Sequence, residues 1–247
     1  MGFSQAKAIT IQDDFSSDPS TNWQLNGDAV WDSSGKWMRL TPAGQNKKGS
    51  MWYKQSFDLS KYSSFTASFK IYLGIDYSWY GADGITFAVI DKSKGLNALG
   101  NYGGSFGYGG IDKSFAVEFD TYQNSTYGDP SDDHIGIDKD GNISSLTTAE
   151  VGEMEDGEWH NAKVTFDIIN GVISVSLDGK KYIDNYKIED FSPFEAYFGF
   201  TGGTGGRYNN QAIDNFNLTL NPVPIPSSML LLLTGLVGSF YLRRQRS

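Results

Sequence analysis

The stretch EFDTYQNSTYGDPSDDHIGID, residues Glu118–Asp138, decides how this chain folds and what it can bind. Within 17 residues this stretch holds Glu118, Asp120, Asn124, Asp129 and His134, which is one of only two histidines in the chain. Oxygen ligands in such density suit a hard cation, and a single imidazole suits a transition ion beside it. The stretch therefore predicts a metal site.

The spacing of these residues brings them to one place. Glu118 and Asp120 are two residues apart, so that on a strand their side chains point to the same face. The chain then leaves the strand as a loop, Asp129 adds a carboxylate, and His134 begins the next strand. Unpaired carboxylates this close would repel one another and raise each other's pKa, and a cation relieves the repulsion. The alternative is a solvated acidic loop, which the histidine and the Glu-x-Asp pair make the weaker interpretation.

The composition favours a β-sandwich and excludes some functions. Of 247 residues, 29 are glycine and 15% are aromatic, which fits one large β domain or two small ones. There is no cysteine, so disulfides and thiolate metal sites are excluded. The net charge of −9 argues against nucleic acid as a partner, because phosphate contacts need basic side chains.

Strand patterns follow one another from residue 9 to residue 220. Residues 65–73 alternate between apolar and polar side chains, as expected of a half-buried strand. The other expected strands cover residues 85–90, 114–122, 135–138, 162–168, 172–177, 197–201 and 216–220. Asn170-Gly171 and Asp178-Gly179 mark tight hairpin turns. We predict a single all-β domain over residues 9–220, an antiparallel sandwich without internal repeats.

The two ends of the chain differ from this domain. In residues 1–8, Ala6-Lys7-Ala8 matches the end of a signal peptide, or matches it by chance. Residues 221–247 contain a proline-rich linker, the apolar stretch Met229–Leu242 and three closing arginines, Arg243, Arg244 and Arg246. The apolar stretch is shorter than the roughly 20 residues of a usual spanning helix. Its all-round apolar surface and basic end nevertheless favour a C-terminal membrane helix over a buried terminal helix.

The metal stretch resembles that of the legume (L-type) lectins, whose fold is the concanavalin A-like sandwich or jelly roll. The resemblance implies a manganese or other transition ion held by Glu118, Asp120, Asp129 and His134, with Ser144 reaching it through water. It also implies a calcium ion that shares Asp120 and Asp129 and adds Asn124 and the backbone carbonyl of Tyr122.

Three further segments resemble the sugar site of the same family. They are Ala82-Asp83-Gly84, with a cis Ala–Asp peptide implied, the glycine loop Gly103–Gly107, and the last loop Gly199–Tyr208. The resemblance implies a carbohydrate site made by Asp83, Gly104, Tyr122, Asn124, Gly206 and Arg207. There Asp83 would accept hydrogen bonds from sugar hydroxyls, and Tyr122 would offer a flat face to the sugar ring. The metals would hold these loops in place and take no part in a reaction.

The end of the chain, VPIPSSMLLLLTGLVGSFYLRRQRS, resembles the PEP-CTERM sorting signal of Gram-negative bacteria. This resemblance implies transient anchoring in the inner membrane, recognition by an exosortase near Val223–Pro226, and export to the cell surface or extracellular matrix. The expected partner is then an exopolysaccharide or a surface glycan, and a homo-oligomer is left open.

Two other functions compete with a lectin. The Glu-x-Asp pair also begins the signature of laminarinase-like glycoside hydrolases on the same sandwich. Those enzymes need a second glutamate two or three residues after the aspartate, and Tyr122 and Gln123 stand there instead. We therefore expect no enzyme. The third interpretation is a structural matrix protein whose metals only stabilise the fold.

Overall fold

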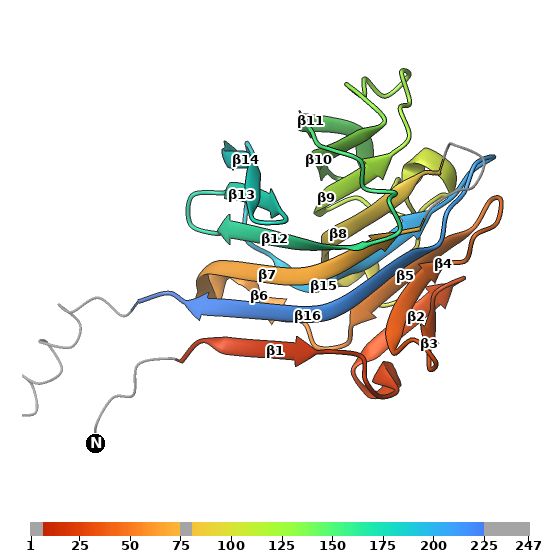
Figure 1. The fold of residues 1–247 in the computed structure, drawn as a ribbon. Coiled ribbons are helices and arrows are strands. Elements are labelled where there is room, and N and C mark those ends of the chain that lie inside the picture. The colour runs from red at the N-terminus through yellow and green to blue at the C-terminus, as the bar shows by residue number, and fades with distance from the viewer. Residues whose placement is uncertain (1–6, 75–80, 225–247) are drawn as a thin grey trace, which may run out of the picture.

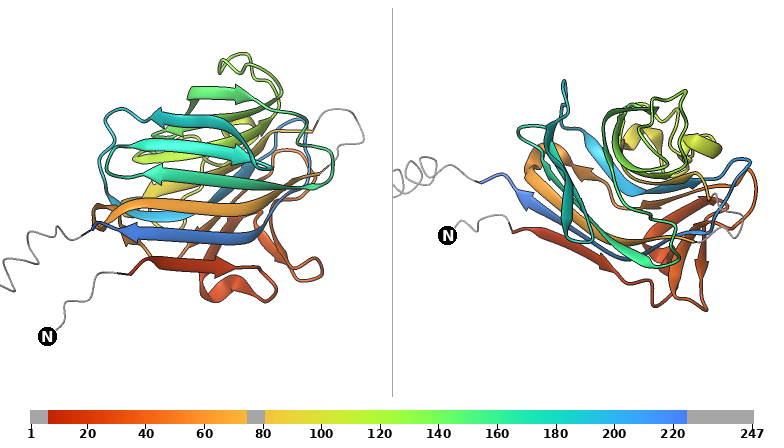
Figure 2. Two further views of the ribbon diagram at one scale, coloured as in Figure 1. Left: turned by 60° about the vertical axis from the view of Figure 1, so that its left-hand side comes forward. Right: turned by 45° about the horizontal axis from the view of Figure 1, so that its top comes forward.

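The computed structural model describes residues 7–74 and 81–224. In these residues two antiparallel sheets of eight strands face each other, as Figures 1 and 2 show. The predicted all-β sandwich over residues 9–220 is thus confirmed as a fold.

The first sheet has the order β14-β13-β12-β7-β16-β4-β3, and β1 pairs with the far part of β16. Its strands are β1 (Ile9–Asp13), β3 (Val30–Asp32), β4 (Trp37–Thr41), β7 (Tyr62–Leu73), β12 (Trp159–Asp167), β13 (Val172–Leu177), β14 (Lys180–Lys187) and β16 (Gln211–Pro222). In Figure 1, β1 and β16 run side by side.

The second sheet has the order β11-β10-β9-β8-β15-β5-β2, and β6 pairs with β15. Its strands are β2 (Trp23–Gly27), β5 (Lys48–Tyr53), β6 (Phe57–Asp58), β8 (Gly84–Asp91), β9 (Ser114–Thr121), β10 (Asp133–Lys139), β11 (Asn142–Glu150) and β15 (Glu195–Gly203). Four short 3-10 helices, η1 (Pro19–Thr21), η2 (Leu59–Lys61), η3 (Lys92–Lys94) and η4 (Gly103–Ser105), are the helices within the described residues.

The main core lies between the two sheets and is rich in aromatic side chains. Every second residue of β7 points into it, and the ring of Phe69 meets that of Phe200 on the opposite sheet edge-on, at 4.8 Å between centroids. A second, smaller core lies on the other face of the second sheet, where Trp52 and Tyr108 pack. Strand β8 is buried on both faces because it contributes to both cores, which explains its continuous apolar run.

The expected strands are present. The turn at Asn170-Gly171 is longer than the tight hairpin that was expected, because residues 168–171 connect β12 and β13. Asp178-Gly179 forms the turn between β13 and β14 with positive φ at both residues, as a tight hairpin requires. The apolar stretch Met229–Leu242, the arginines after it and most of residues 1–8 lie outside the described residues, so their predictions stay predictions. Among the helices of the described ranges, none has the length and apolar character to cross a membrane.

The fold brings the ends of three neighbouring strands together. Asp83 directly precedes β8, Tyr122 directly follows β9, and His134 is the second residue of β10. Gly84 pairs with Asp120 on β9 and with Gly203 on β15, so the last loop reaches the same edge. All predicted site segments therefore meet at one end of the second sheet.

Candidate functional site

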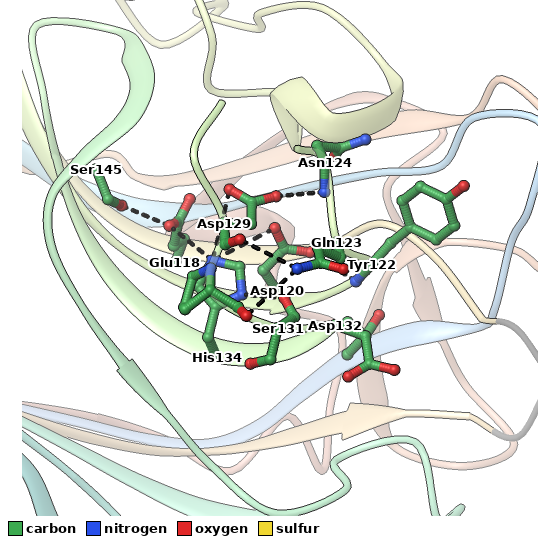
Figure 3. Close-up of polar contacts among 12 residues, drawn as sticks. Glu118, Asp120, Tyr122, Gln123, Asn124, Asp129, Ser131, Asp132, His134 and Ser145 are labelled. Atoms are coloured by element: carbon green, nitrogen blue, oxygen red, sulfur yellow. Dashed lines mark hydrogen bonds and ion pairs between the residues drawn. The ribbon is translucent and has the colours of Figure 1, made fainter. Parts of the chain in front are cut away.

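The cluster predicted from Glu118–Asp138 is present and buried. His134 Nε2 lies 3.5 Å from Glu118 Oε1, 3.7 Å from Asp120 Oδ2 and 3.8 Å from Asp129 Oδ1 (Figure 3). Ligand atoms about 2.2 Å from a common ion lie roughly 3 to 4.4 Å apart, so this spacing suits a shared cation. Asp120, Asp129 and His134 form a group that could hold a metal ion.

The histidine presents the right atom to such an ion. Its Nδ1 lies 3.0 Å from the carbonyl oxygen of Ser131. A carbonyl oxygen only accepts, so Nδ1 carries a proton and Nε2 faces the carboxylates. Nε2 is fully buried and has no hydrogen-bond partner. An orphaned imidazole nitrogen beside three carboxylates fits a metal site better than a purely structural one.

The backbone holds the two aspartates in place. Asp120 Oδ1 accepts a hydrogen bond from the backbone N–H of Tyr122 at 2.8 Å, and Asp129 Oδ2 accepts one from that of Asn124 at 2.6 Å. Each carboxylate thereby keeps its other oxygen, Asp120 Oδ2 or Asp129 Oδ1, directed at His134. The start of the loop between β9 and β10 is therefore held by hydrogen bonds from its backbone to the side chains of Asp120 and Asp129.

The serine beside the cluster is Ser145, and the prediction of Ser144 is wrong. Ser145 Oγ donates to Glu118 Oε1 at 2.5 Å, and it also lies 2.8 Å from Asp138 Oδ1. Ser144 is exposed, because alternate residues of β11 point to opposite faces. The hairpin turn at Asp140-Gly141 sets this register.

Asp138, the last residue of the expected strand over residues 135–138, is a buried carboxylate that was not predicted to belong to the site. It is fully buried on the same face of β10 as His134, and its Oδ2 has no partner. The spacing of two and four residues from His134 could have indicated this. Gly136 lies between them, and a Cβ there would overlap Glu118 and Ser145. Only glycine leaves room for the cluster.

Burial and mutual repulsion raise the pKa values of the acids in the cluster. Burial, and then the charge of Glu118, raises the pKa of Asp120 and of Asp138 well above the ordinary range. Burial also raises the pKa of Asp129. Burial alone would lower the pKa of His134, but Glu118 and Asp129 outweigh it and raise this pKa. A bound cation would relieve this crowding of negative charge.

Asp83 lies beside the metal cluster and points into the last loop. Its side chain is 5% exposed, and Oδ2 has no hydrogen-bond partner. A Cβ added to Gly205 would lie 3.2 Å from this oxygen, and one added to Gly103 would lie 3.9 Å away. Burial raises the pKa of Asp83 to about 7. The peptide bond between Ala82 and Asp83 is cis, as the family resemblance implies.

Gly104, in η4, and Asn124, in the loop between β9 and β10, lie close together. Asn124 Oδ1 is buried without a partner, and a Cβ on Gly104 would overlap it. Position 104 therefore needs glycine. Asn124 is accordingly placed between the metal cluster, through its backbone N–H to Asp129, and the glycine loop.

Gly206 and Arg207 are exposed in the last loop. The Arg207 guanidinium lies over the ring of Tyr122, 5.8 Å from its centroid. This ring points away from the carboxylates in Figure 3. A sugar that stacks on Tyr122 therefore needs the opposite face of the ring or must displace Arg207. The structure brings all six predicted carbohydrate residues to the same edge of the sheet, and their contact with a sugar stays a prediction.

Comparison with known proteins agrees with this geometry. The sequence matches the legume lectin beta-barrel domain over residues 14–216. The lectin of Pisum sativum is 29% identical over 192 residues, covering 69% of this chain and 69% of that protein. The alpha-methyl-mannoside-specific lectin of Arachis hypogaea is 28% identical over 226 residues, covering 80% of this chain and 78% of that protein.

Solved structures share the fold. Peanut lectin superimposes with a TM-score of 0.76 at 24% identity, over 89% of this chain and all of that one. The lectin from Bauhinia forficata in complex with GalNAc gives 0.75 at 23% identity, over 87% of this chain and 99% of that one. Lectin UEA-II complexed with galactose gives 0.71 at 25% identity, over 88% of this chain and all of that one.

The chain belongs to the legume (L-type) lectin family, a class of carbohydrate-binding proteins. Its relatives are non-catalytic lectins, which confirms the choice of a binding protein over a hydrolase.

Proposed function

We propose that this protein binds a sugar unit of a larger glycan at the edge formed by Asp83, the glycine loop and the last loop. The observation that carries this is the Asp83 carboxylate, buried with one oxygen unpartnered between Gly103 and Gly205. A buried polar atom without a partner costs free energy, so it marks a place where a ligand supplies the missing hydrogen bond. A sugar hydroxyl is such a donor.

The site would depend on metal ions. Glu118, Asp120, Asp129 and His134 would hold a transition ion such as manganese. Asp120, Asp129, Asn124 and the carbonyl of Tyr122 would hold calcium. The ions would supply positive charge that balances the buried acids and keeps the loop ordered, which lowers the entropy lost on binding. The chain itself would bind the sugar through Asp83, the Gly104 N–H and the Asn124 amide.

Galactose and GalNAc are the sugars to test first, and mannosides come second. Two of the structures named above hold GalNAc and galactose, and a curated relative is described as specific for alpha-methyl-mannoside. We propose an exopolysaccharide or surface glycan of a Gram-negative bacterium as the natural ligand. Support for this setting comes from the sequence of residues 222–247, which resembles an export and sorting signal.

A glycan array tests the proposal. The wild type is applied with calcium and manganese, with and without EDTA, beside Asp83→Ala. The matched control is Glu189→Ala, an exposed acid near the opposite end of β10. We expect binding that EDTA and Asp83→Ala each abolish and that Glu189→Ala retains. Binding that persists in Asp83→Ala would place the sugar elsewhere. Metal-dependent folding without any glycan binding would favour the structural matrix protein instead.

A further inference from the structure

The loop between β11 and β12, residues 151–158, is anchored on both sides. At its start, Asp133 accepts two hydrogen bonds, from the Met154 N–H to Oδ1 at 2.9 Å and from the Val151 N–H to its backbone carbonyl at 3.2 Å. At its end, Asp156 Oδ1 lies 3.1 Å from His160 Nε2. Met154 is fully buried in the main core. The loop is therefore a fixed part of the structure.

Glu155, between these anchors, turns toward the segment that carries Asp83. Its Oε1 accepts a hydrogen bond from Asn209 Nδ2 at 3.0 Å. It contacts Gly81 so closely that a Cβ at that position would overlap Oε1. The exposed neighbours Glu153 and Glu158 make no hydrogen bond of this kind with their side chains in the described residues.

Two backbone hydrogen bonds hold the carbonyl groups on either side of the Asp83 Cα atom, and the partner of Glu155, Asn209, makes the first of them. The Asn209 backbone N–H donates to the Ala82 carbonyl at 3.2 Å. The Thr121 backbone N–H donates to the Asp83 carbonyl at 2.8 Å. The direction of the Asp83 side chain depends on these two peptide groups, and Glu155 holds the residue that binds the first of them, Asn209.

A buried amide network completes the arrangement. Gln211 Nε2 lies 3.0 Å from Asn209 Oδ1, 3.2 Å from the Ala82 carbonyl and 2.8 Å from the Gly203 carbonyl. The Asp83 N–H donates to the same Gly203 carbonyl at 3.1 Å. The Asn209 side chain thus donates to Glu155 and accepts from Gln211, so that the network ends on the β11–β12 loop.

We infer that Glu155 is a positioning residue of the carbohydrate site, which orients the Asp83 carboxylate through Asn209. The inference rests on the proposed function, because it takes sugar binding as the role of this network. Glu155 itself does not touch the sugar. Its contribution is to fix the Ala82–Asp83 segment before the ligand arrives, so that binding does not have to order it.

Affinity and hydrogen exchange test this together, on the full chain loaded with calcium and manganese. The probe is the strongest glycan that the wild type selects on the array. Glu155→Ala should weaken binding on the order of tenfold, the loss expected for one buried hydrogen-bonding group. Glu155→Gln keeps the acceptor for Asn209 and should stay within about twofold of wild type. The matched control Glu158→Ala, an exposed glutamate of the same loop, should bind as wild type does.

A readout without sugar separates the two proposals. In Glu155→Ala the amide protons of Asp83 and Asn209 should exchange faster by NMR, and in Glu155→Gln they should not. If the wild type selects no glycan, the proposed function fails, and the exchange data alone decide whether Glu155 orders the Asp83 segment. Unchanged exchange in Glu155→Ala would overturn the inference, as would unchanged affinity.

A double-mutant cycle tests whether Glu155 and Asn209 act together. Glu155 and Asn209 act as one unit, so Glu155→Ala combined with Asn209→Ala should cost little more affinity than either substitution alone. Additive losses would overturn the link between them. If Glu155→Ala does not fold, Asn209→Ala removes the donor of the same hydrogen bond and should show the same loss of affinity and the same faster exchange at Asp83.

Discussion

His134 and Asp120 stand directly opposite each other in the β9–β10 ladder, with Nε2 of the imidazole 3.7 Å from Oδ2 of the carboxylate. The pairing of two strands therefore places one ligand from each at the same point. The loop between the strands only has to return Asp129, which its own backbone contacts hold. The sheet thus fixes the positions of Asp120 and His134 relative to each other.

Removal of metal should destabilise the protein. The buried acids of the cluster repel one another without a cation, so calcium and manganese should raise the thermal unfolding temperature and EDTA should lower it. At a free ion concentration of 100 times Kd, the gain is about 2.7 kcal/mol. His134→Gln should lose most of the manganese-dependent part in differential scanning calorimetry. Equal metal-dependent gains in wild type and His134→Gln would contradict the assignment.

The two adjacent serines of β11 should differ sharply on substitution. Ser145→Ala removes the hydroxyl between Glu118 and Asp138 and should cost about 1–3 kcal/mol in the free energy of unfolding by urea. Ser144→Ala, on the exposed face, should stay within about 0.5 kcal/mol of wild type. The opposite order of the two effects would mean that the register of β11 is wrong.

Two glycines of the site should also respond differently. Gly104→Ala places a Cβ against Asn124 and should lower both glycan affinity and calcium affinity in isothermal titration calorimetry. Gly206→Ala meets nothing within 4 Å, and its φ is not positive, so it should leave calcium affinity unchanged. A tolerated Gly104→Ala would show that Asn124 can move without loss of function.

Glu155 should make stability depend on pH. Burial, and then the charge of Asp133, raises its pKa from an ordinary 4.5 to about 8, so the folded protein holds this proton more tightly than the unfolded chain does. Between these two values the folded state binds more protons, and stability contributed by the neutral group falls as pH rises. Glu155→Gln stays neutral, and its free energy of unfolding should therefore increase relative to wild type from pH 5 toward pH 8. A constant difference across this range would show that Glu155 does not titrate in it.

Local patterns in the sequence predicted most of the fold. Alternation predicted β7, and the continuous apolar run predicted β8, because these patterns report directly which faces of a strand are buried. The boundaries differ by a few residues, as for β7, which begins at Tyr62 and not at residue 65. The order of strands within each sheet was not predicted, since side-chain alternation carries no information about which strands pair.

The metal site was predicted more completely than the residues behind it. The residues that could hold the ion lie within one short stretch, where their spacing places them together. Ser145 was missed by one position, because the exact register of a hairpin depends on turn geometry. Glu155 and Asn209 are 54 residues apart, and no local pattern signals a contact between them. Such residues become visible only when the chain is folded.

The pairing of β1 with β16 has a consequence for how this protein can be engineered. Ile9 stands opposite Leu220, so the start of the first strand and the end of the last strand lie next to each other, at the end of the sandwich away from Asp83. A short glycine-serine connection from Val223 to Lys7 would join them without crossing the sheet. New termini could then be opened between the exposed residues Ile169 and Asn170 of the turn between β12 and β13, at the end of the sandwich away from Asp83 and His134. Such a circular permutant should keep every strand pair and lose only the chain connection between β12 and β13. It should also retain the cluster around His134 and the end of the sheet that carries Asp83.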